Sequence, residues 1–319
     1  MAAAVNYSES AVVFQCEGRQ LIGVIASPLD HLRATGVLIL VGGPQYRAGS
    51  HRQFTLLARN LAAHGITSLR FDTRGMGDSE GDPQRFDDLD DDIEAAIDTL
   101  CVHEPRLQSI VIWGLCDAAS AALIYGHRDQ RVSGLVLLNP WVHTEASAAR
   151  VRLKHYYLRR LMDLSLWRKL LSGHFRFGQS LRDLGKSLRA MFGQVQCAVK
   201  PCERDHSAMQ PDSDSSIDRI QSTATNWIER MRDGLCRFKG EILCILSGND
   251  LIASEFDALI HEDPRWRHAC RSKRFSRRVI PQANHTFSSD EWREAVSKFT
   301  VDFIEHGISG DESACCDGH

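Results

Sequence analysis

The chain has 319 residues, of which 43% are hydrophobic and 25% are charged, and its formal net charge at pH 7 is -3. This composition is ordinary for a globular protein and excludes a disordered or fibrous chain. The small net charge gives no reason to expect nucleic acid or an anionic membrane as the main partner. No uncharged apolar run approaches the roughly 18 residues that span a bilayer, so no integral membrane association is expected.

The scattered cysteines and residues 1–10 indicate a reducing compartment. Residues 1–10 lack the basic and apolar parts of a signal peptide, and the ten cysteines are scattered, so reduced thiols in the cytoplasm are expected. Cys315, Cys316 and His319 suggest a metal site only weakly, because two adjacent cysteines lack ligand spacing. We therefore expect no metal or other cofactor, and a disordered tail at 308–319.

Short apolar runs alternate with amphipathic stretches, which is the pattern of helices that flank a mostly parallel sheet. After an opening hairpin, strands and helices alternate as far as Pro140, and the alternation resumes after Gly240. The expected strands are 11–15, 21–27, 36–43, 66–72, 109–113, 134–139, 241–248 and 277–281, and the expected helices are 54–65, 88–100, 117–126, 255–263 and 291–307. The sequence therefore predicts an α/β core made of residues 1–140 and 241–307.

Residues 141–240 interrupt the alternation with polar, helical sequence and Ser-rich connections. We expect a helical lid over the carboxyl ends of the strands, where open α/β sheets bind ligands. Tyr156 and Tyr157 would line the substrate pocket or pack within the lid. The start of this segment is basic, which fits either an anionic substrate or carrier or a solvated amphipathic face. The basic residues are Arg150, Arg152, Lys154, Arg159, Arg160, Arg168 and Lys169.

The segment most informative about chemistry is SIVIWGLCDAASAALIYG, in which a buried strand runs through Cys116 into an Ala-rich helix. It resembles the nucleophile elbow of the α/β-hydrolase family, G-x-S-x-G, with cysteine for serine and alanine for the last glycine. Such a tight turn requires small residues two positions before and after the nucleophile, here Gly114 and Ala118. The following helix N-terminus would favour a thiolate and then an oxyanion. The alternative is a small buried residue at a strand end, the commonest fate of a free cysteine.

Two further residues occupy the positions that the family order of nucleophile, acid and histidine requires. Asp250 follows the strand at 241–248, where its carboxylate would either orient an imidazole or cap the next helix. His285 follows the last strand, and none of the other thirteen histidines has that placement; the alternative is a surface-loop histidine. In a triad, His285 would take the thiol proton, Cys116 would attack an acyl carbonyl, and water would cleave the acyl-enzyme.

An oxyanion hole needs two backbone N–H donors, one of them from the residue after the nucleophile, Asp117. The loop VGGPQYRAG resembles the HGGPG oxyanion loop with valine for histidine, which implies Gly43 as the second donor, since Pro44 has no N–H. The Asp117 carboxylate would oppose the developing charge unless it points away or is paired, and Arg47 is a candidate partner. Gln45 and Arg47 are also candidate substrate contacts.

In more detail, a further resemblance is carried by the segments GGPQYRAGSHRQF, RFDTRGMGDSEG, WGLCDAASAALIY, LVLLNPWVHTEA and LKHYYL. Together they resemble the exosortase A system-associated hydrolases, type one, and the resemblance extends over most of the chain. That family belongs to bacterial loci for exopolysaccharide production and protein sorting, so the resemblance implies a cytoplasmic accessory hydrolase. We expect cleavage of an ester or thioester in a small-molecule or carrier-bound acyl substrate. The alternatives are an acyltransferase that passes the acyl group to a glycan or carrier, and a non-catalytic scaffold; the oligomeric state is not predicted.

Overall fold

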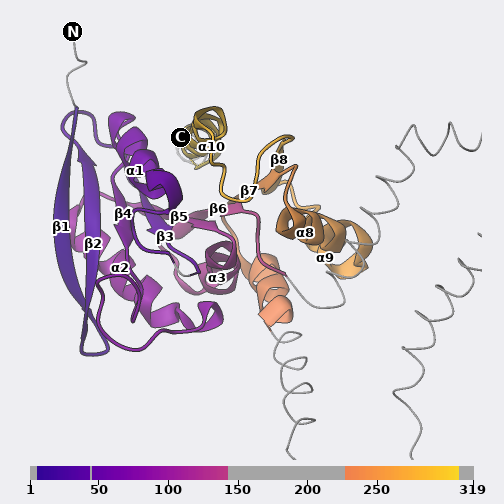
Figure 1. Cartoon of the computed structure of the whole chain (residues 1–319), viewed down its shortest axis with the longest axis horizontal. Helices are drawn as coiled ribbons and strands as arrows, with labels where there is room; N and C mark the ends of the chain where they lie inside the picture. The colour runs from indigo at the N-terminus through magenta and orange to yellow at the C-terminus, as the bar shows by residue number, and fades with distance from the viewer. Residues whose placement is uncertain (1–5, 44, 143–226, 309–319) are drawn as a thin grey trace, which may run out of the picture. The chain divides into compact units, whose positions relative to one another are not determined.

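The computed structural model describes residues 6–43, 45–142 and 227–308, which form an eight-stranded sheet with the order β1-β2-β4-β3-β5-β6-β7-β8 (Figure 1). The hairpin of β1 (Tyr7–Cys16) and β2 (Arg19–Pro28) joins the sheet antiparallel to β4 (Ser68–Phe71). All other neighbours are parallel: β3 (Thr35–Leu40), β4, β5 (Ser109–Leu115), β6 (Val132–Leu138), β7 (Glu241–Ser247) and β8 (Phe275–Ile280). The prediction of a mostly parallel sheet is confirmed.

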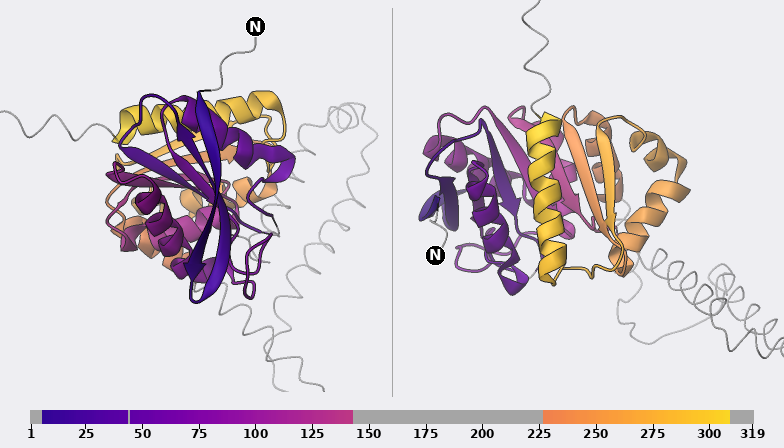
Figure 2. Two further views of the ribbon diagram at one scale, coloured as in Figure 1. Left: turned by 90° about the vertical axis from the view of Figure 1, so that its left-hand side faces the viewer. Right: turned by 90° about the horizontal axis from the view of Figure 1, so that it is seen from above.

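Helices cover both faces of the sheet, which is why its central strands are apolar on both sides (Figure 2). In β5, Ile110 and Ile112 pack into one core, whereas Val111 and Trp113 pack into the other. The first core is shared with α2 (Asp90–His103), α3 (Asp117–Tyr125), α8 (Leu251–Glu262) and α9 (Pro264–Ala269), and the second with α1 (Gln53–Ala63) and α10 (Asp290–Phe303).

Beyond small shifts of element ends, three features differ from the expected elements. The strands of the hairpin extend beyond the apolar runs from which they were predicted. Side chains along a strand point alternately to its two faces, and the exposed face of β1 carries polar residues that interrupt its apolar sequence. The short helix α9 was not predicted; Asp263 caps it and Pro264 occupies its first turn. Helix α10 continues as a π-helical turn over Ile304–Ile308.

The predicted lid lies mostly outside the described residues. Of the range 141–240, the structure describes 141–142 and a stretch from 227 onward whose residues 227–237 are helical and lead into β7. Tyr156, Tyr157 and the basic residues of the segment are outside the described residues, as is the expected disordered tail apart from Ile308. The lid and the tail remain predictions.

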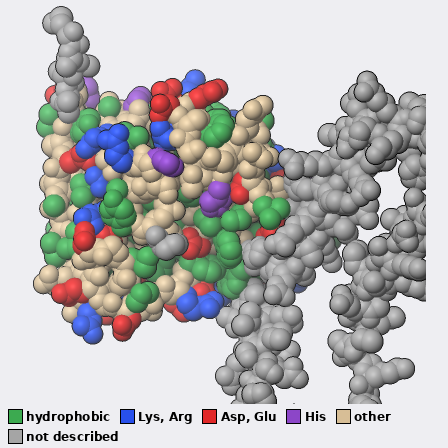
Figure 3. Space-filling view, viewed as in Figure 1, with side chains coloured by type: hydrophobic (Ala, Val, Ile, Leu, Met, Phe, Trp, Pro, Cys, Tyr) green, Lys and Arg blue, Asp and Glu red, His purple; other side chains and the backbone are tan. Residues whose placement is uncertain are grey.

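The described surface carries mixed charge. On the face shown in Figure 3, Lys and Arg side chains are interspersed with Asp and Glu. Among the helices in the described residues, none is long and apolar enough to cross a membrane. The six cysteines within the described ranges are all free thiols.

Candidate active site

Cys116 lies at the junction of β5 and α3 and has a strained backbone, with φ 63° and ψ -123°. A residue other than glycine persists in such a conformation only when its surroundings enforce it. Here the Cys116 N–H donates to the Leu138 carbonyl at the end of β6 (2.8 Å), and its own carbonyl accepts from the Ala119 N–H (3.1 Å) and the Trp141 N–H (3.2 Å). The turn is thus fixed by the neighbouring strand, by the first turn of α3 and by the segment after β6.

Small residues make this turn sterically possible, as the sequence predicts. A Cβ atom at Gly114 would lie 2.7 Å from the carbonyl carbon and oxygen of Ala118, which is too close for any side chain. Ala118 itself is fully buried against the strand. The structure therefore has the sharp strand-to-helix corner that raises the residue at its apex, Cys116, out of the sheet.

His285 and Asp250 meet at the same edge of the sheet. The distance between His285 Nδ1 and the nearer carboxylate oxygen of Asp250 is 2.8 Å, and the Asp250 side chain is only 9% exposed. Asp250 also caps α8, because its carboxylate accepts the N–H groups of Ile252 (3.4 Å) and Ala253 (3.2 Å). Both roles considered for Asp250 therefore occur together, and the cap orients the carboxylate toward the imidazole.

The imidazole of His285 connects the carboxylate to the thiol. Burial disfavours its charge, but hydrogen bonds with the side chains of Asp250 and Cys116 outweigh burial and raise the pKa of His285 to about 10. Since Nδ1 faces Asp250, the other ring nitrogen, Nε2, is left for the sulfur. The structure thus brings together the three residues that the sequence singled out, in the order carboxylate, imidazole, thiol.

Asn139 holds the histidine loop, and sequence reasoning missed it. This fully buried residue has φ 45°, and its amide nitrogen donates to the His285 carbonyl (3.0 Å) and to the Ser247 hydroxyl (2.8 Å). Its amide oxygen accepts the Ser247 N–H (2.8 Å), and the Ser247 hydroxyl bonds the Asn284 carbonyl (2.8 Å). The sequence signal that could have indicated this network is a polar residue at the end of each of two apolar strands, Asn139 after β6 and Ser247 in β7.

The Gly43 N–H, one of the two expected oxyanion donors, is already engaged by a side chain. The Gly43 N–H donates to Asp117 Oδ2 at 2.8 Å, and the Ala118 N–H donates to Asp117 Oδ1 at 2.9 Å. The loop approaches so closely that a Cβ atom at Gly42 would lie 2.0 Å from Asp117 Oδ1. Burial raises the pKa of the Asp117 carboxyl, although the backbone hydrogen bonds act in the opposite direction. The carboxylate therefore occupies the Gly43 N–H, which was expected to stabilise an oxyanion.

The suggestion that Arg47 pairs with Asp117 is wrong. Arg47 instead bonds Asp72 through its guanidinium and through its backbone N–H (2.6 Å), and it forms an ion pair with Asp78 at 2.7 Å. Because Asp72 is fully buried, these contacts anchor the loop that carries Gly43. Gln45 Oε1 accepts the Ser50 N–H at 3.3 Å, a contact inside the same loop. Neither arrangement tests a role of Gln45 or Arg47 in substrate binding, which stays a prediction.

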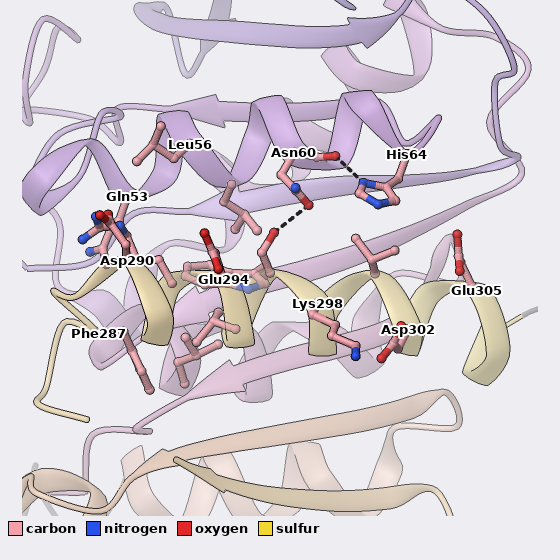
Figure 4. A pocket seen from close by; sticks show the side chains of 17 residues that line it. Gln53, Leu56, Asn60, His64, Phe287, Asp290, Glu294, Lys298, Asp302 and Glu305 are labelled. Carbon is pink, nitrogen blue, oxygen red and sulfur yellow. Dashed lines mark hydrogen bonds and ion pairs between the residues drawn. The ribbon is translucent and has the colours of Figure 1, made fainter. Parts of the chain in front are cut away.

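A cavity of about 620 Å³ lies elsewhere, between α1 and α10 (Figure 4). Its walls include Asn60 of α1, whose side chain accepts the Ser297 hydroxyl of α10 at 2.7 Å, and charged residues such as Lys298 at its rim. Cys116, His285 and Asp250 do not line it. We place the candidate site at the carboxyl ends of the strands, because ligands of open α/β sheets bind there. Within the described residues, no group of three His, Cys, Asp or Glu side chains is arranged to hold a metal ion.

Comparison with known protein families agrees with this geometry. Residues 34–193 match the hydrolase family described as serine aminopeptidase, S33 (Hydrolase_4), which is half of the chain. The chain belongs to this family. The matched S33 region includes the strained corner, but the apex of that corner holds Cys116 where the family is named for serine. Asp250 and His285 lie beyond the matched region.

Solved structures show that this S33-family chain has the α/β-hydrolase fold. The esterase Pf2001 of Pyrococcus furiosus superposes with a TM-score of 0.60 at 15% identity, over 95% of this chain and 94% of the esterase. Est1E of Butyrivibrio proteoclasticus, solved with ferulic acid, has a TM-score of 0.54 at 14% identity, over 92% and 100% of the two chains. An alpha-beta serine hydrolase homologue from Coxiella burnetii has a TM-score of 0.53 at 15% identity, over 91% and 96%.

One curated relative matches a shorter stretch. The polyketide transferase grgF of Penicillium sp is 29% identical over 101 residues, which is 30% of this chain. The match spans about a third of the length of that relative, 33%.

Proposed function

We propose that this S33-family hydrolase cleaves an ester or thioester through an acyl-enzyme on Cys116, with His285 as general base and Asp250 as the residue that orients the imidazole. The observation that carries the proposal is the strained conformation of Cys116 beside a histidine whose Nδ1 is 2.8 Å from the Asp250 carboxylate. A nucleophile, a base and an orienting acid in contact are the minimum for acyl transfer.

In the first half-reaction, Nε2 of His285 carries the proton that it has taken from the thiol, and the sulfur attacks the carbonyl carbon of the substrate. The carbonyl oxygen carries the negative charge of the tetrahedral intermediate, and backbone N–H groups stabilise it. When the intermediate collapses, the bond to the alcohol or thiol breaks and His285 delivers the proton to that leaving group. In the second half-reaction, His285 takes a proton from water, hydroxide attacks the thioester, and the acid leaves as the thiol is restored.

The cysteine favours esters and thioesters over amides as substrates. A thiolate is a better leaving group than an amine anion, so an intermediate formed on a peptide bond tends to return to substrate unless the amine is protonated. The similarity to the esterase Pf2001 is consistent with this class of substrate. The resemblance to exosortase A system-associated hydrolases extends the proposal to a cytoplasmic accessory role in exopolysaccharide production, with a small-molecule or carrier-bound acyl substrate.

The test is the loss of turnover in Cys116→Ala. We expect the wild type to hydrolyse p-nitrophenyl or acyl-CoA esters and to gain the mass of one acyl group on Cys116 when it is quenched during turnover. Cys116→Ala should lose both signals, and retained turnover in that variant would exclude the assignment.

Iodoacetamide separates an enzyme from an inert scaffold, because only an activated and accessible thiol reacts in the folded protein. Cys116 should be alkylated at neutral pH. Cys244 provides an internal control: it is fully buried and burial raises the pKa of its thiol, so it should react only after unfolding. If Cys116 also reacts only after unfolding, the result would favour a non-catalytic scaffold.

A second candidate, acyl transfer to a glycan hydroxyl or carrier, is favoured by the match to a polyketide transferase. It uses the same acyl-enzyme, and the acceptor then takes the place of water in the second half-reaction. Product analysis with and without acceptor sugars distinguishes the two: a transferase forms an acylated sugar at the expense of free acid, whereas a hydrolase releases the same acid in both reactions.

A further inference from the structure

The Asp117 side chain occupies the Gly43 N–H, which the sequence suggests as an oxyanion donor. Its carboxylate accepts the N–H of Gly43 at 2.8 Å and the N–H of Ala118 at 2.9 Å, and its own backbone N–H also interacts with it. Distances of about 2.7–3.1 Å are those at which oxyanion-hole donors hold a developing charge. Asp117 Oδ2 therefore engages the Gly43 N–H in the way that an oxyanion would, which also indicates that this N–H can bind an anion.

A substrate oxygen and this carboxylate cannot share the site. Gly42 lies so close that even a Cβ atom there would be 2.0 Å from Asp117 Oδ1, so the loop closes tightly over the carboxylate. Two negatively charged oxygens that compete for the same N–H donors also repel each other. The site is consequently either filled by Asp117 or open to substrate.

The contacts of Asp117 allow it to leave. In the part of the chain that the structure describes, no Lys or Arg forms an ion pair with its carboxylate, and Arg47 is committed to Asp72 and Asp78, although the charge of His285 does stabilise the carboxylate. Burial raises the pKa of the Asp117 carboxyl, which means that the site favours the charged form less than water does. A carboxylate that rotates toward water regains the hydration that it lacks in the site.

We propose that the Asp117 carboxylate is an internal occupant of the oxyanion site, which an acyl substrate must displace from the Gly43 N–H before Cys116 can form the tetrahedral intermediate. This inference rests on the proposed acyl-enzyme function. The consequence is selectivity. A substrate that makes further contacts with the protein can offset the free-energy cost of displacing Asp117 with its binding energy, whereas a small ester makes too few contacts to do so. Asp117 is therefore a specificity-determining residue that suppresses reaction with small esters.

The experiment compares acylation with alkylation of Cys116 in Asp117→Ala. Acylation by p-nitrophenyl acetate is followed by the release of p-nitrophenol and by the mass of Cys116, and alkylation by iodoacetamide is followed by mass. Because a single oxyanion-hole donor changes rates by about 10²–10³-fold, freeing the donors should speed acylation at least about tenfold. Displacement of iodide develops no oxyanion, so alkylation should change less than about threefold.

Two further variants control for folding. Asp117→Ser shortens the side chain so that it no longer reaches Gly43, and serine suits the start of a helix, so this variant serves if the alanine variant does not fold. Asp91→Ala removes a carboxylate from the first turn of α2, with a side chain that is 57% exposed, and controls for the loss of a favourable interaction with a helix dipole. We expect faster acylation in both Asp117 variants and wild-type acylation in Asp91→Ala.

Each outcome decides between explanations. If acylation is unchanged or slower in the Asp117 variants, the displacement proposal is overturned, while Cys116-dependent acylation leaves the proposed function standing. If acylation and alkylation rise by the same factor, Asp117 acts on the thiol and the proposal is likewise overturned. If Cys116 is acylated in no variant although iodoacetamide labels it, the proposed function fails and this inference fails with it.

Discussion

Asp250 has two separable roles, and substitutions at this position test them one at a time. Its carboxylate accepts the N–H groups of Ile252 and Ala253 as the cap of α8, and it lies 2.8 Å from His285 Nδ1. Asparagine caps helices about as well as aspartate, but it is neutral and cannot stabilise an imidazolium. Asp250→Asn therefore retains the cap and removes the charge, whereas Asp250→Ala removes both.

The magnitudes follow from these contacts. A hydrogen bond to a charged group contributes about 1.5–3 kcal/mol, which corresponds to about 10- to 150-fold in rate at 1.36 kcal/mol per factor of ten. In a Ser-His-Asp triad the change from aspartate to asparagine lowers kcat by about 10⁴-fold, because the imidazole also takes the wrong tautomer. For Asp250→Asn we expect a loss of about 10²–10⁴-fold in kcat, and because the cap is retained the free energy of unfolding should fall only by what the Asp250 charge contributes to protonated His285. Asp250→Ala should show a similar loss in kcat and a further cost of about 1 kcal/mol in the free energy of unfolding.

The assay is steady-state hydrolysis of a p-nitrophenyl ester together with urea unfolding of each variant. Asp263 provides the matched control, because it caps α9 through the N–H groups of Arg265 (2.7 Å) and Trp266 (3.4 Å) and belongs to no part of the candidate site. Asp263→Ala should lower the free energy of unfolding by about 1 kcal/mol and leave kcat unchanged. Asp250→Asn with kcat within tenfold of wild type would refute the reasoning and leave Asp250 as a helix cap alone.

Two further predictions concern the histidine loop. Asn139→Ala leaves the Ser247 N–H and the His285 carbonyl without their partner, so it should lower the free energy of unfolding by about 1–3 kcal/mol and also reduce kcat; unchanged urea unfolding would contradict the buried network. The raised pKa of His285, about 10 against an ordinary 6.5, means that its protonated form contributes stability fully below about pH 6.5 and loses that contribution as the pH rises toward 10. The stability difference between wild type and His285→Ala, measured by urea unfolding across that range, should therefore shrink with rising pH, and a difference that grows would reverse the assigned cause.

Much of the fold was predictable because it is encoded by local patterns. Buried parallel strands are continuous apolar runs and their helices have an apolar face, so the alternation along the chain indicates the layers of the sheet. The positions of β7 and β8 followed in the same way from the resumed alternation after Gly240. The short helix α9 did not, since its six residues give too little periodicity to recognise.

The strained corner was also a local property. Only small residues fit at Gly114 and Ala118, so the amino-acid types along β5 and α3 by themselves determined that the chain turns sharply at Cys116. The sequence further suggested His285 and Asp250 from their places after late strands. The meeting of these side chains is a consequence of the strand order β5-β6-β7-β8, which aligns the carboxyl ends of the strands that carry them.

Tertiary structure alone decided the contacts that depend on side-chain direction. The sequence raised the question of the Asp117 carboxylate, but its rotation toward the Gly43 N–H depends on how closely a loop from another strand approaches. The commitment of Arg47 to Asp72 and the bridge from Asn139 to His285 likewise join residues that only the assembled sheet brings together. Local sterics and periodicity act between neighbours in the chain, whereas a hydrogen bond between distant segments requires that both be placed to within a fraction of an ångström by the packing of the whole core.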